Sequence, residues 1–180
     1  MQIISTAIPD VLIVQPKVFG DSRGFFMESW SAEKFNAAVG HAVTFVQDNH
    51  SRSSQGVLRG LHYQLEQTQG KLVRVVSGKV WDVAVDLRRA SPTFAQWCGV
   101  ELSAENQRMF WVPAGCAHGF VVTGESAVFL YKTTDYYAPA HERTIVWNDP
   151  SLAIDWPVAT PIVNAKDAAG ASFKQSPTFK

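Results

Sequence analysis

The segment VLRGLHYQ, residues 57–64, places an arginine, a histidine and a glutamine within a short stretch of strand-like sequence. In a regular strand successive side chains point to opposite faces, so Arg59 and His62 would point away from each other. Gly60 between them is a natural place for a bulge, which would bring both side chains into one cavity. We therefore expect an irregular strand that offers an imidazole for proton transfer and a guanidinium for anion binding. The alternative is a partly exposed edge strand whose arginine and histidine are solvated.

A second histidine stands in PAGCAHGF, residues 113–120, where the Pro-x-Gly-x-x-His spacing predicts a sharp turn followed by a strand that carries His118. This spacing resembles the second motif of the cupin barrels, which usually supplies a metal-binding histidine. The first cupin motif has two histidines separated by one residue and then a glutamate, whereas here His62 is followed by Gln64 and Glu66. An iron site from His62, His118 and Glu66 stays open as an alternative. Glutamine is a poor substitute for imidazole, so we expect no metal.

Three tyrosines, Tyr131, Tyr136 and Tyr137, lie within the segment FLYKTTDYY. A tyrosine in a β-rich core is most simply explained by packing, with its hydroxyl hydrogen-bonded. Near a polar cavity, however, a phenol can donate a proton or stack on an aromatic ligand. This segment is therefore a third candidate for chemistry.

The elements that must position these residues are mostly strands. Runs rich in β-branched and aromatic residues predict strands at residues 24–30, 43–47, 71–76, 79–87, 94–102, 109–113 and 126–134. Ser77-Gly78 and Gly124-Glu125 predict two tight hairpin turns. In the run 79–87 the alternation of apolar and polar side chains predicts that one face of the strand is buried and that the other is directed at a polar environment. Together these patterns indicate an all-β fold, a closed or nearly closed antiparallel barrel or jelly roll that can hold a ligand in its mouth.

Helical signals are few. Ser31 is an N-cap candidate for the run SAEKFNAAV, with Gly40 as its stop. A second short helix is predicted between Asn164 and Gly170, with Asp167 in its first turn, where a carboxylate suits the helix dipole. We expect one domain over residues 1–180, with a frayed tail over about residues 171–180.

The run GFFMESW, residues 24–30, carries large apolar groups on both faces, with Phe25 and Met27 on one and Phe26 and Trp30 on the other. Such a strand must be covered on both sides. It is either a central strand of a sandwich or part of an interface with a second subunit.

Composition excludes several classes of protein. The 16 basic and 16 acidic residues cancel, so no overall field favours nucleic acid or an anionic membrane. No apolar run approaches the about 20 residues that span a bilayer, and no secretory signal is recognisable. The two cysteines, Cys98 and Cys116, form no disulfide framework of the secreted kind. We expect a cytoplasmic protein with free thiols.

The ordered set of motifs resembles one family closely. FGDSRGFFMESW, FVQDNHSRSSQGVLRGLHYQ, QGKLVRVVSGKVWDVAVDLR, SPTF, WVPAGCAHGF, LYKTTDYY and WNDP occur in the order found in dTDP-4-dehydrorhamnose 3,5-epimerases. The resemblance covers roughly residues 8–169. It implies a cupin-type jelly roll, no cofactor, the substrate dTDP-4-dehydro-6-deoxy-D-glucose, and a homodimer with exchanged N-terminal strands.

The resemblance also implies a role for individual residues. His62 matches the general base, Asp167 the carboxylate that orients it, and Tyr131 the acid on the opposite face of the sugar. Lys71 matches the cation beside the C4 carbonyl. Residues that match nucleotide or sugar contacts are Arg23, Glu28, Gln47, Asp48, Asn49, Arg59, His118, Tyr137, Glu142 and Lys166. Of these, Arg23 and Glu28 are contributed by the neighbouring subunit, and Tyr137 stacks on or near the base.

Three alternatives to a double epimerase stay open at this point: an epimerase acting at C3 or C5 alone on another dTDP-deoxysugar, a metal-dependent cupin, and a non-catalytic sugar-nucleotide binding module. Tyr131 argues against the first, and the combination of base, acid and cation argues against the last.

Overall fold

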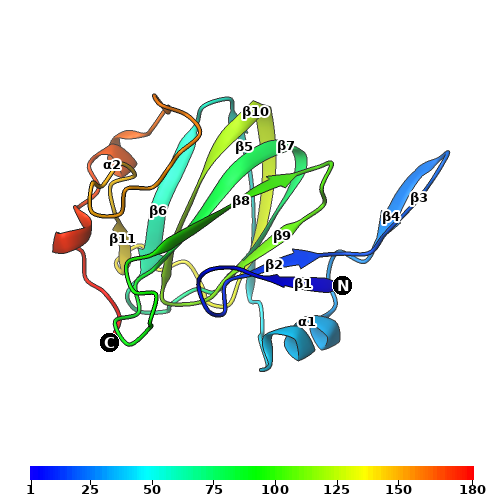
Figure 1. The fold of residues 1–180 in the computed structure, drawn as a ribbon, viewed down its shortest axis with the longest axis horizontal. Helices are drawn as coiled ribbons and strands as arrows, with labels where there is room; N and C mark the ends of the chain where they lie inside the picture. Colours follow the sequence, from blue (N-terminus) through cyan, green and yellow to red (C-terminus); the bar gives the residue numbers. More distant parts are fainter.

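The computed structural model describes residues 1–180 as an antiparallel β-barrel with short helices at its periphery (Figure 1). The expected cupin-type jelly roll is confirmed. The main sheet has the order β1-β2-β9-β7-β10-β6-β11, with β5 paired to β10 and β8 paired to β7. Its strands are β1 Gln2–Ser5, β2 Leu12–Gln15, β5 Gln47–Ser54, β6 Leu58–Gln64, β7 Lys71–Asp86, β8 Trp97–Ser103, β9 Met109–Val112, β10 Cys116–Thr133 and β11 Glu142–Thr144. No helix is both long enough and apolar enough to cross a bilayer.

The two longest strands, β7 and β10, pair with each other along almost their whole lengths. The predicted hairpin turns at Ser77-Gly78 and Gly124-Glu125 are therefore wrong, since both positions lie inside these continuous strands. Gly78 has a φ of 74°, and a Cβ there would lie 1.7 Å from the carbonyl oxygen of Ser126. The glycine bends β7 against β10 at a register shift and does not reverse the chain. Pairing between distant strands overrides the local turn signal.

The strand predictions fail around β5, where an apolar run is not a strand and a polar run is. The run at 43–47 is wrong except for its last residue, because β5 begins at Gln47. That strand reads QDNHSRSS and carries almost no β-forming residue, so its propensity could not reveal it. In the run 79–87 both faces prove to be buried: Val80 and Ala84 enter one core cluster, while Val83 and Val85 enter another.

The first helix, α1 Ala32–Val39, is confirmed with both its caps. The Ser31 hydroxyl accepts a hydrogen bond from the backbone N–H of Lys34 at 3.5 Å, and Gly40 takes the left-handed conformation with a φ of 79°. Its buried Phe35 packs against an aromatic cluster at the base of the barrel, formed by Trp30, Phe45 and Trp111. The helix thereby fixes the segment that leads into β5.

The second helix, α2 Ala165–Ala168, is also present, and the Asn164 side chain accepts from the Asp167 N–H at 2.7 Å. The expectation of a frayed tail after it is wrong. The chain passes through a single 3₁₀ turn, Phe173–Gln175, and Phe179 forms a parallel bridge to Arg88. Aromatic packing and backbone hydrogen bonds thus anchor the tail to the barrel.

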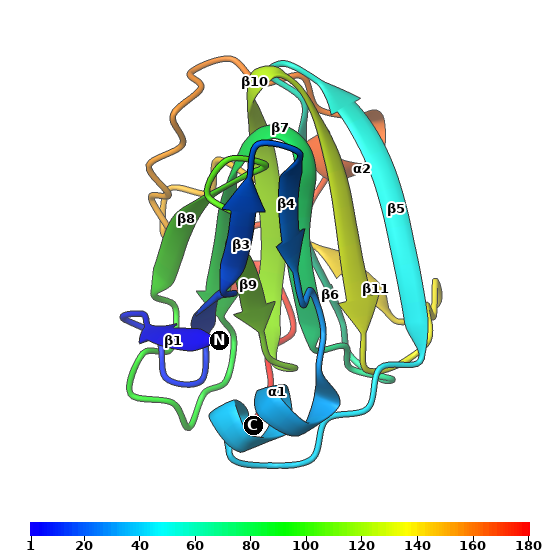
Figure 2. The same ribbon diagram turned by 90° about the vertical axis from the view of Figure 1, so that its right-hand side faces the viewer.

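The hairpin of β3 Val18–Asp21 and β4 Gly24–Met27 projects away from the barrel in Figure 1 and lies in front of it, towards the viewer, in Figure 2. Its side chains Phe19, Phe25 and Phe26 are 54%, 61% and 71% exposed. The prediction of a central sandwich strand is therefore wrong. The other explanation, an interface with a second subunit, stays a prediction.

Candidate active site

The barrel encloses a cavity of about 330 Å³, lined by side chains from β5, β6, β7, β10 and β11 and from the loop after β10. Strands distant in sequence meet here because β10 pairs with β5, β6 and β7. The cavity collects eight of the residues expected at a substrate site: Asn49, Arg59, His62, Lys71, His118, Tyr131, Tyr137 and Glu142.

The expected irregularity at Gly60 is confirmed. From Arg59 to His62 the strand β6 advances three residues, while its partner β10 advances only two, from Phe120 to His118. Gly60 has a φ of 124°, and a Cβ there would lie 2.6 Å from the Cα of Gly119, so no other residue fits without a shift of the backbone. The bulge breaks the alternation of side chains, and both Arg59 and His62 line the cavity.

His62 is held by Asp167, which the fold brings to it from α2. His62 Nε2 lies 2.6 Å from Asp167 Oδ1, and Asp167 Oδ2 accepts the backbone N–H of Gly60 at 3.0 Å. Asp167 is fully buried, which raises the pKa of its carboxyl, but the hydrogen bonds from His62 and Gly60 outweigh burial and leave that pKa below its usual value. An ionised Asp167 fixes the Nε2–H tautomer, so the lone pair that can accept a proton is on Nδ1.

Tyr131, from β10, lines the same cavity as His62, as a pair of proton-transferring groups must. Burial raises the pKa of its phenol, and the nearby Glu142 carboxylate raises it further. The hydroxyl is therefore protonated near neutral pH and can serve as a proton donor.

Lys71, from β7, is buried beside these groups, and its Nζ donates to the backbone carbonyl of His62 at 3.4 Å. Burial lowers the pKa of this ammonium to about 8, although the carboxylates of Glu142 and Asp82 oppose the change. Lys71 therefore carries its charge at neutral pH in a site largely withdrawn from water, where a cation acts strongly on a developing anion.

Three polar residues are linked at the exposed side of the cavity. The hydroxyl of Tyr137 donates to Glu142 Oε2 at 2.8 Å, and Lys166 forms an ion pair with the same oxygen. Gln47 accepts the backbone N–H of Tyr137 at 3.1 Å and donates to Asn49 at 3.0 Å. The expected residues Gln47 and Lys166 thus contact cavity residues without lining the cavity themselves.

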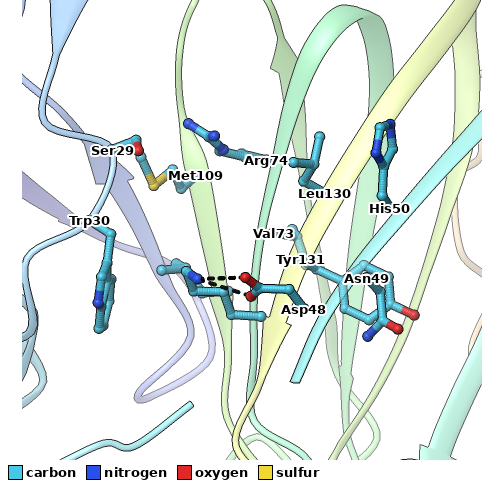
Figure 3. A pocket seen from close by; sticks show the side chains of 12 residues that line it. Ser29, Trp30, Asp48, Asn49, His50, Val73, Arg74, Met109, Leu130 and Tyr131 are labelled. Atoms are coloured by element: carbon cyan, nitrogen blue, oxygen red, sulfur yellow. Dashed lines mark hydrogen bonds and ion pairs between the residues drawn. The ribbon is translucent and has the colours of Figure 1, made fainter. Parts of the chain in front are cut away.

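A second hollow, of about 280 Å³, lies on the outer side of the sheet, and Figure 3 shows its lining. Ser29 and Trp30, just after β4, form one side of it, and it shares Asn49 and Tyr131 with the barrel cavity. Asp48 lies here and forms an ion pair with Lys132 at 2.9 Å. The structure therefore does not bring Asp48 into the barrel cavity.

Arg23 and Glu28 are the other expected residues that lie elsewhere. The side chain of Arg23 is 87% exposed at the tip of the projecting hairpin and pairs with Asp21. Glu28 pairs with Lys34 at 2.7 Å. Neither contributes to the cavity of its own chain.

The alternative metal set is not assembled. Glu66 is exposed and lies 3.6 Å from His141, while the Nε2 atoms of His62 and His118 face Asp167 and Asp82. No group of three or more His, Cys, Asp or Glu side chains is placed to hold a metal ion.

Sequence reasoning missed the four other side chains that line the cavity, His50, Ser51, Phe120 and Phe129, and one buried charge beside it. Asp82, in the middle of β7, is fully buried and its Oδ1 lies 2.8 Å from His118 Nε2. The sequence feature that could have identified Asp82 is a charged residue within the apolar run 79–87, on the face predicted to be directed at a polar environment.

Comparison with known proteins agrees with this geometry. The family model described as dTDP-4-dehydrorhamnose 3,5-epimerase matches residues 5–175. A dTDP-4-dehydrorhamnose 3,5-epimerase from Pseudomonas aeruginosa is 62% identical over 180 residues, covering 99% of both chains. The crystal structure of a dTDP-6-deoxy-D-glucose-3,5-epimerase from Legionella pneumophila, in complex with dTDP-4-keto-L-rhamnose, superposes with a TM-score of 0.95 at 54% identity and covers 98% of this chain and 94% of that one. A Bacillus anthracis dTDP-4-dehydrorhamnose 3,5-epimerase with TDP and PPi bound has a TM-score of 0.91 at 43% identity, covering 95% and 98%.

Proposed function

The chain belongs to the dTDP-4-dehydrorhamnose 3,5-epimerase family, and from this membership we propose which of its side chains perform the reaction. It is an isomerase that inverts C3 and C5 of dTDP-4-dehydro-6-deoxy-D-glucose and so makes dTDP-4-dehydro-L-rhamnose. Both carbons are adjacent to the C4 carbonyl, so each inversion removes a proton, forms an enolate and returns a proton from the other face of the ring. The single observation that carries the assignment of roles is that His62, backed by Asp167, and Tyr131 line one cavity.

His62 is the proposed base. An imidazole can both accept and release a proton, which suits it to general base catalysis. When Nδ1 takes the proton from carbon, the ring becomes a cation, and the buried Asp167 carboxylate at 2.6 Å stabilises it. A positioned base of this kind contributes roughly 10²–10⁴-fold to the rate.

Tyr131 is the proposed acid, which returns a proton to the face of the ring opposite His62. Its raised pKa keeps the phenol protonated until the enolate forms. Inversion needs two proton-transferring groups, one on each face of the bound sugar ring. Here the two groups come from different strands. With one group alone, the proton would return to the face it left.

Lys71 is the proposed partner of the enolate oxygen. A negative charge develops on O4 when the proton leaves, and an ammonium held in a buried position stabilises that charge without reorganising. The proposed mechanism therefore needs no cofactor beyond the side chains of the chain.

The nucleotide is the proposed anchor for the small sugar ring. Arg59 uses its Nε to donate to Ser53 Oγ at 3.0 Å, which leaves its two terminal nitrogens available to two diphosphate oxygens. Binding energy from the diphosphate then holds the sugar in reactive geometry. The remaining proposed contacts to nucleotide or sugar are Gln47, Asp48, Asn49, His118, Tyr137, Glu142 and Lys166.

A homodimer with exchanged hairpins completes the proposed site. The exposed faces of Phe25 and Phe26 would be covered by a second copy, and Arg23 and Glu28 would then reach the neighbouring cavity. The cytoplasm is the proposed location, which fits the two free cysteines.

The test is exchange of hydrogen with solvent. The enzyme is incubated with dTDP-4-dehydro-6-deoxy-D-glucose in deuterated water, and deuterium is read by NMR at C3 and C5 separately. We expect label at both carbons with wild-type enzyme, and almost none at either with His62→Ala. Label at one carbon only in wild type would identify a single-position epimerase. Substantial label at either carbon with His62→Ala would exclude a single base.

A further inference from the structure

Asp82 is a buried charge that the reaction described above does not use. It is wholly inaccessible in the middle of β7, and only one of its carboxylate oxygens, Oδ1, has a hydrogen-bond partner, His118 Nε2 at 2.8 Å. The other oxygen, Oδ2, is buried without any partner. An ionised carboxylate satisfied on one side only is costly in a protein interior, and apolar side chains of similar volume commonly stabilise a fold better. Stability alone therefore does not explain an aspartate here.

The surroundings of Asp82 are specific. In the sheet Asp82 pairs with Phe120 of β10 and Val100 of β8, and its side chain reaches His118, which pairs with Ala84. Cys98 of β8 also pairs with Ala84, and burial raises the pKa of its thiol to about 11. Burial raises the pKa of Asp82, whereas the charges of His118 and Lys71 oppose that change. His118 and Lys71 both line the barrel cavity, and the buried carboxylate contacts the first at 2.8 Å and acts on the second through its charge.

The two histidine–carboxylate pairs of the site differ in the hydrogen bonds of the carboxylate and in the exposure of the histidine. In the pair of His62 and Asp167, both carboxylate oxygens accept a hydrogen bond, and the histidine side chain is 28% exposed. In the pair of His118 and Asp82, the histidine side chain is 8% exposed and one carboxylate oxygen is unpaired. The first pair is built to exchange a proton with a ligand. The second has a buried charge whose influence on neighbouring cations is little screened.

We propose that Asp82 is a positioning residue: its carboxylate fixes His118 with Nε2–H directed away from the cavity and Nδ1 towards the ligand, and its charge keeps Lys71 an ammonium. The proposal rests on the proposed function of the cavity. It adds to the site a second, buried carboxylate, which acts on His118 and Lys71 without contacting the substrate.

The charge of Asp82 can be removed with little change of shape. Asp82→Asn leaves an oxygen that accepts from His118 Nε2 but carries no charge. Of the two carboxylates that support the charge of Lys71, only Glu142 then acts on it. The other titratable or charged groups that line the cavity are unchanged; they are His50 from β5, Arg59 and His62 from β6, His118 and Tyr131 from β10, and Tyr137.

The readout is the pH dependence of kcat. Lys71 already has a pKa near 8, so we expect activity of the wild-type enzyme to fall as the pH rises through that value. Without the charge of Asp82 the ammonium loses its proton more easily, and the alkaline limb should move to lower pH by roughly 1 unit, as expected when a nearby opposite charge is lost. An unchanged limb in folded Asp82→Asn would overturn the proposal.

Asp86→Asn is the matched control. Asp86 is also wholly buried on β7, but it pairs with Arg88 at 2.9 Å on the side of the C-terminal tail, away from the cavity. This variant should lose thermal stability and keep the wild-type pH profile. If both variants shift the limb alike, a general loosening of β7 is responsible and the proposal fails.

If Asp82→Asn does not fold, the orientation of His118 can still be tested on the wild-type enzyme. In a ¹⁵N spectrum of histidine-labelled wild-type enzyme, His118 Nε2 should stay protonated from pH 6 to pH 9, and a deprotonated Nε2 would contradict the proposal. Failure of the proposed function is recognised separately, because the wild-type enzyme would then incorporate no deuterium into the substrate. An active wild-type enzyme with an unshifted Asp82→Asn profile rejects the role of Asp82 alone.

Discussion

The substitution Asp167→Asn tests the proposed base most sharply, because the structure gives this carboxylate two donors. Asp167 Oδ1 accepts from His62 Nε2 at 2.6 Å, and Oδ2 accepts from the Gly60 N–H at 3.0 Å. Asparagine has the same shape but only one acceptor oxygen. Whichever way the amide turns, one of the two donors faces an NH₂ group.

Both orientations impair the base. If the NH₂ group faces His62, the imidazole must accept at Nε2, its proton moves to Nδ1, and the lone pair needed for catalysis is lost. If the NH₂ group faces Gly60, a buried N–H is left without an acceptor at a cost of about 1–3 kcal/mol, and the imidazolium formed in the reaction lacks its counter-charge. We expect kcat to fall roughly 10²–10⁴-fold, the range that a positioned base supplies. That range corresponds to about 3–5 kcal/mol of activation free energy.

The assay is the initial rate of deuterium incorporation at C3 and C5, measured with saturating substrate. Asp149→Asn is the control, because Asp149 is also buried and accepts backbone N–H groups, from Ser151 at 2.8 Å and Phe173 at 2.8 Å, outside the cavity. The control should be destabilised and still turn over at the rate of wild type. A folded Asp167→Asn enzyme with kcat within threefold of wild type would refute the assignment of His62 and Asp167 as base and partner.

Four further predictions follow from the same geometry. Tyr131→Phe should lower kcat roughly 10²–10⁴-fold with little change in the Kd of dTDP by calorimetry; a large rise in Kd at unchanged turnover would contradict its role as acid. Lys71→Met should abolish turnover yet raise the free energy of unfolding in urea at pH 7. The reason is that burial lowers the pKa of Lys71 from 10.5 to about 8, so below pH 8 the charged lysine destabilises the folded state by up to about 3 kcal/mol. This penalty decreases as the pH rises from 8 and vanishes at about 10.5. A variant less stable than wild type would show that the charge of Lys71 is well solvated. Arg59→Ala should weaken dTDP binding by about 1.5–3 kcal/mol in the same titration, the value of a hydrogen bond to a charged group, and undiminished affinity would remove Arg59 from the diphosphate site. The wild-type enzyme should sediment as a dimer and the double variant Phe25→Ser, Phe26→Ser as a monomer; a dimeric variant would exclude the hairpin from the interface.

The local features of the fold were readable from the sequence. The caps of α1, Ser31 and Gly40, act within a few residues, so the sequence alone specifies where that helix begins and ends. The bulge at Gly60 was also predictable, because an arginine and a histidine on opposite faces of a strand could share a cavity only if the alternation broke. The motifs quoted above identified the family before any geometry was known, and the comparisons confirm it.

Other features depend on contacts between residues far apart in the chain. Gly78 reads locally as a turn, but β7 continues through it because β10 pairs with it on both sides. Strand β5 has almost no β-forming residues and is held in the sheet by β10 alone. The pairing of β7 with β10 brings Asp82 to His118, which no spacing along the chain could reveal.

The sequence by itself thus determined the helix caps, the break in β6 and the chemical types of the site residues, because these depend on neighbours a few positions away. Which carboxylate meets which histidine is decided by the tertiary structure; the family resemblance implied Asp167 for His62, whereas only the structure revealed Asp82 for His118. Asp167 reaches His62 across 105 residues, and Asp82 reaches His118 across 36. Such partners are selected by strand pairing and by the packing of α2 against β6, which are properties of the whole fold.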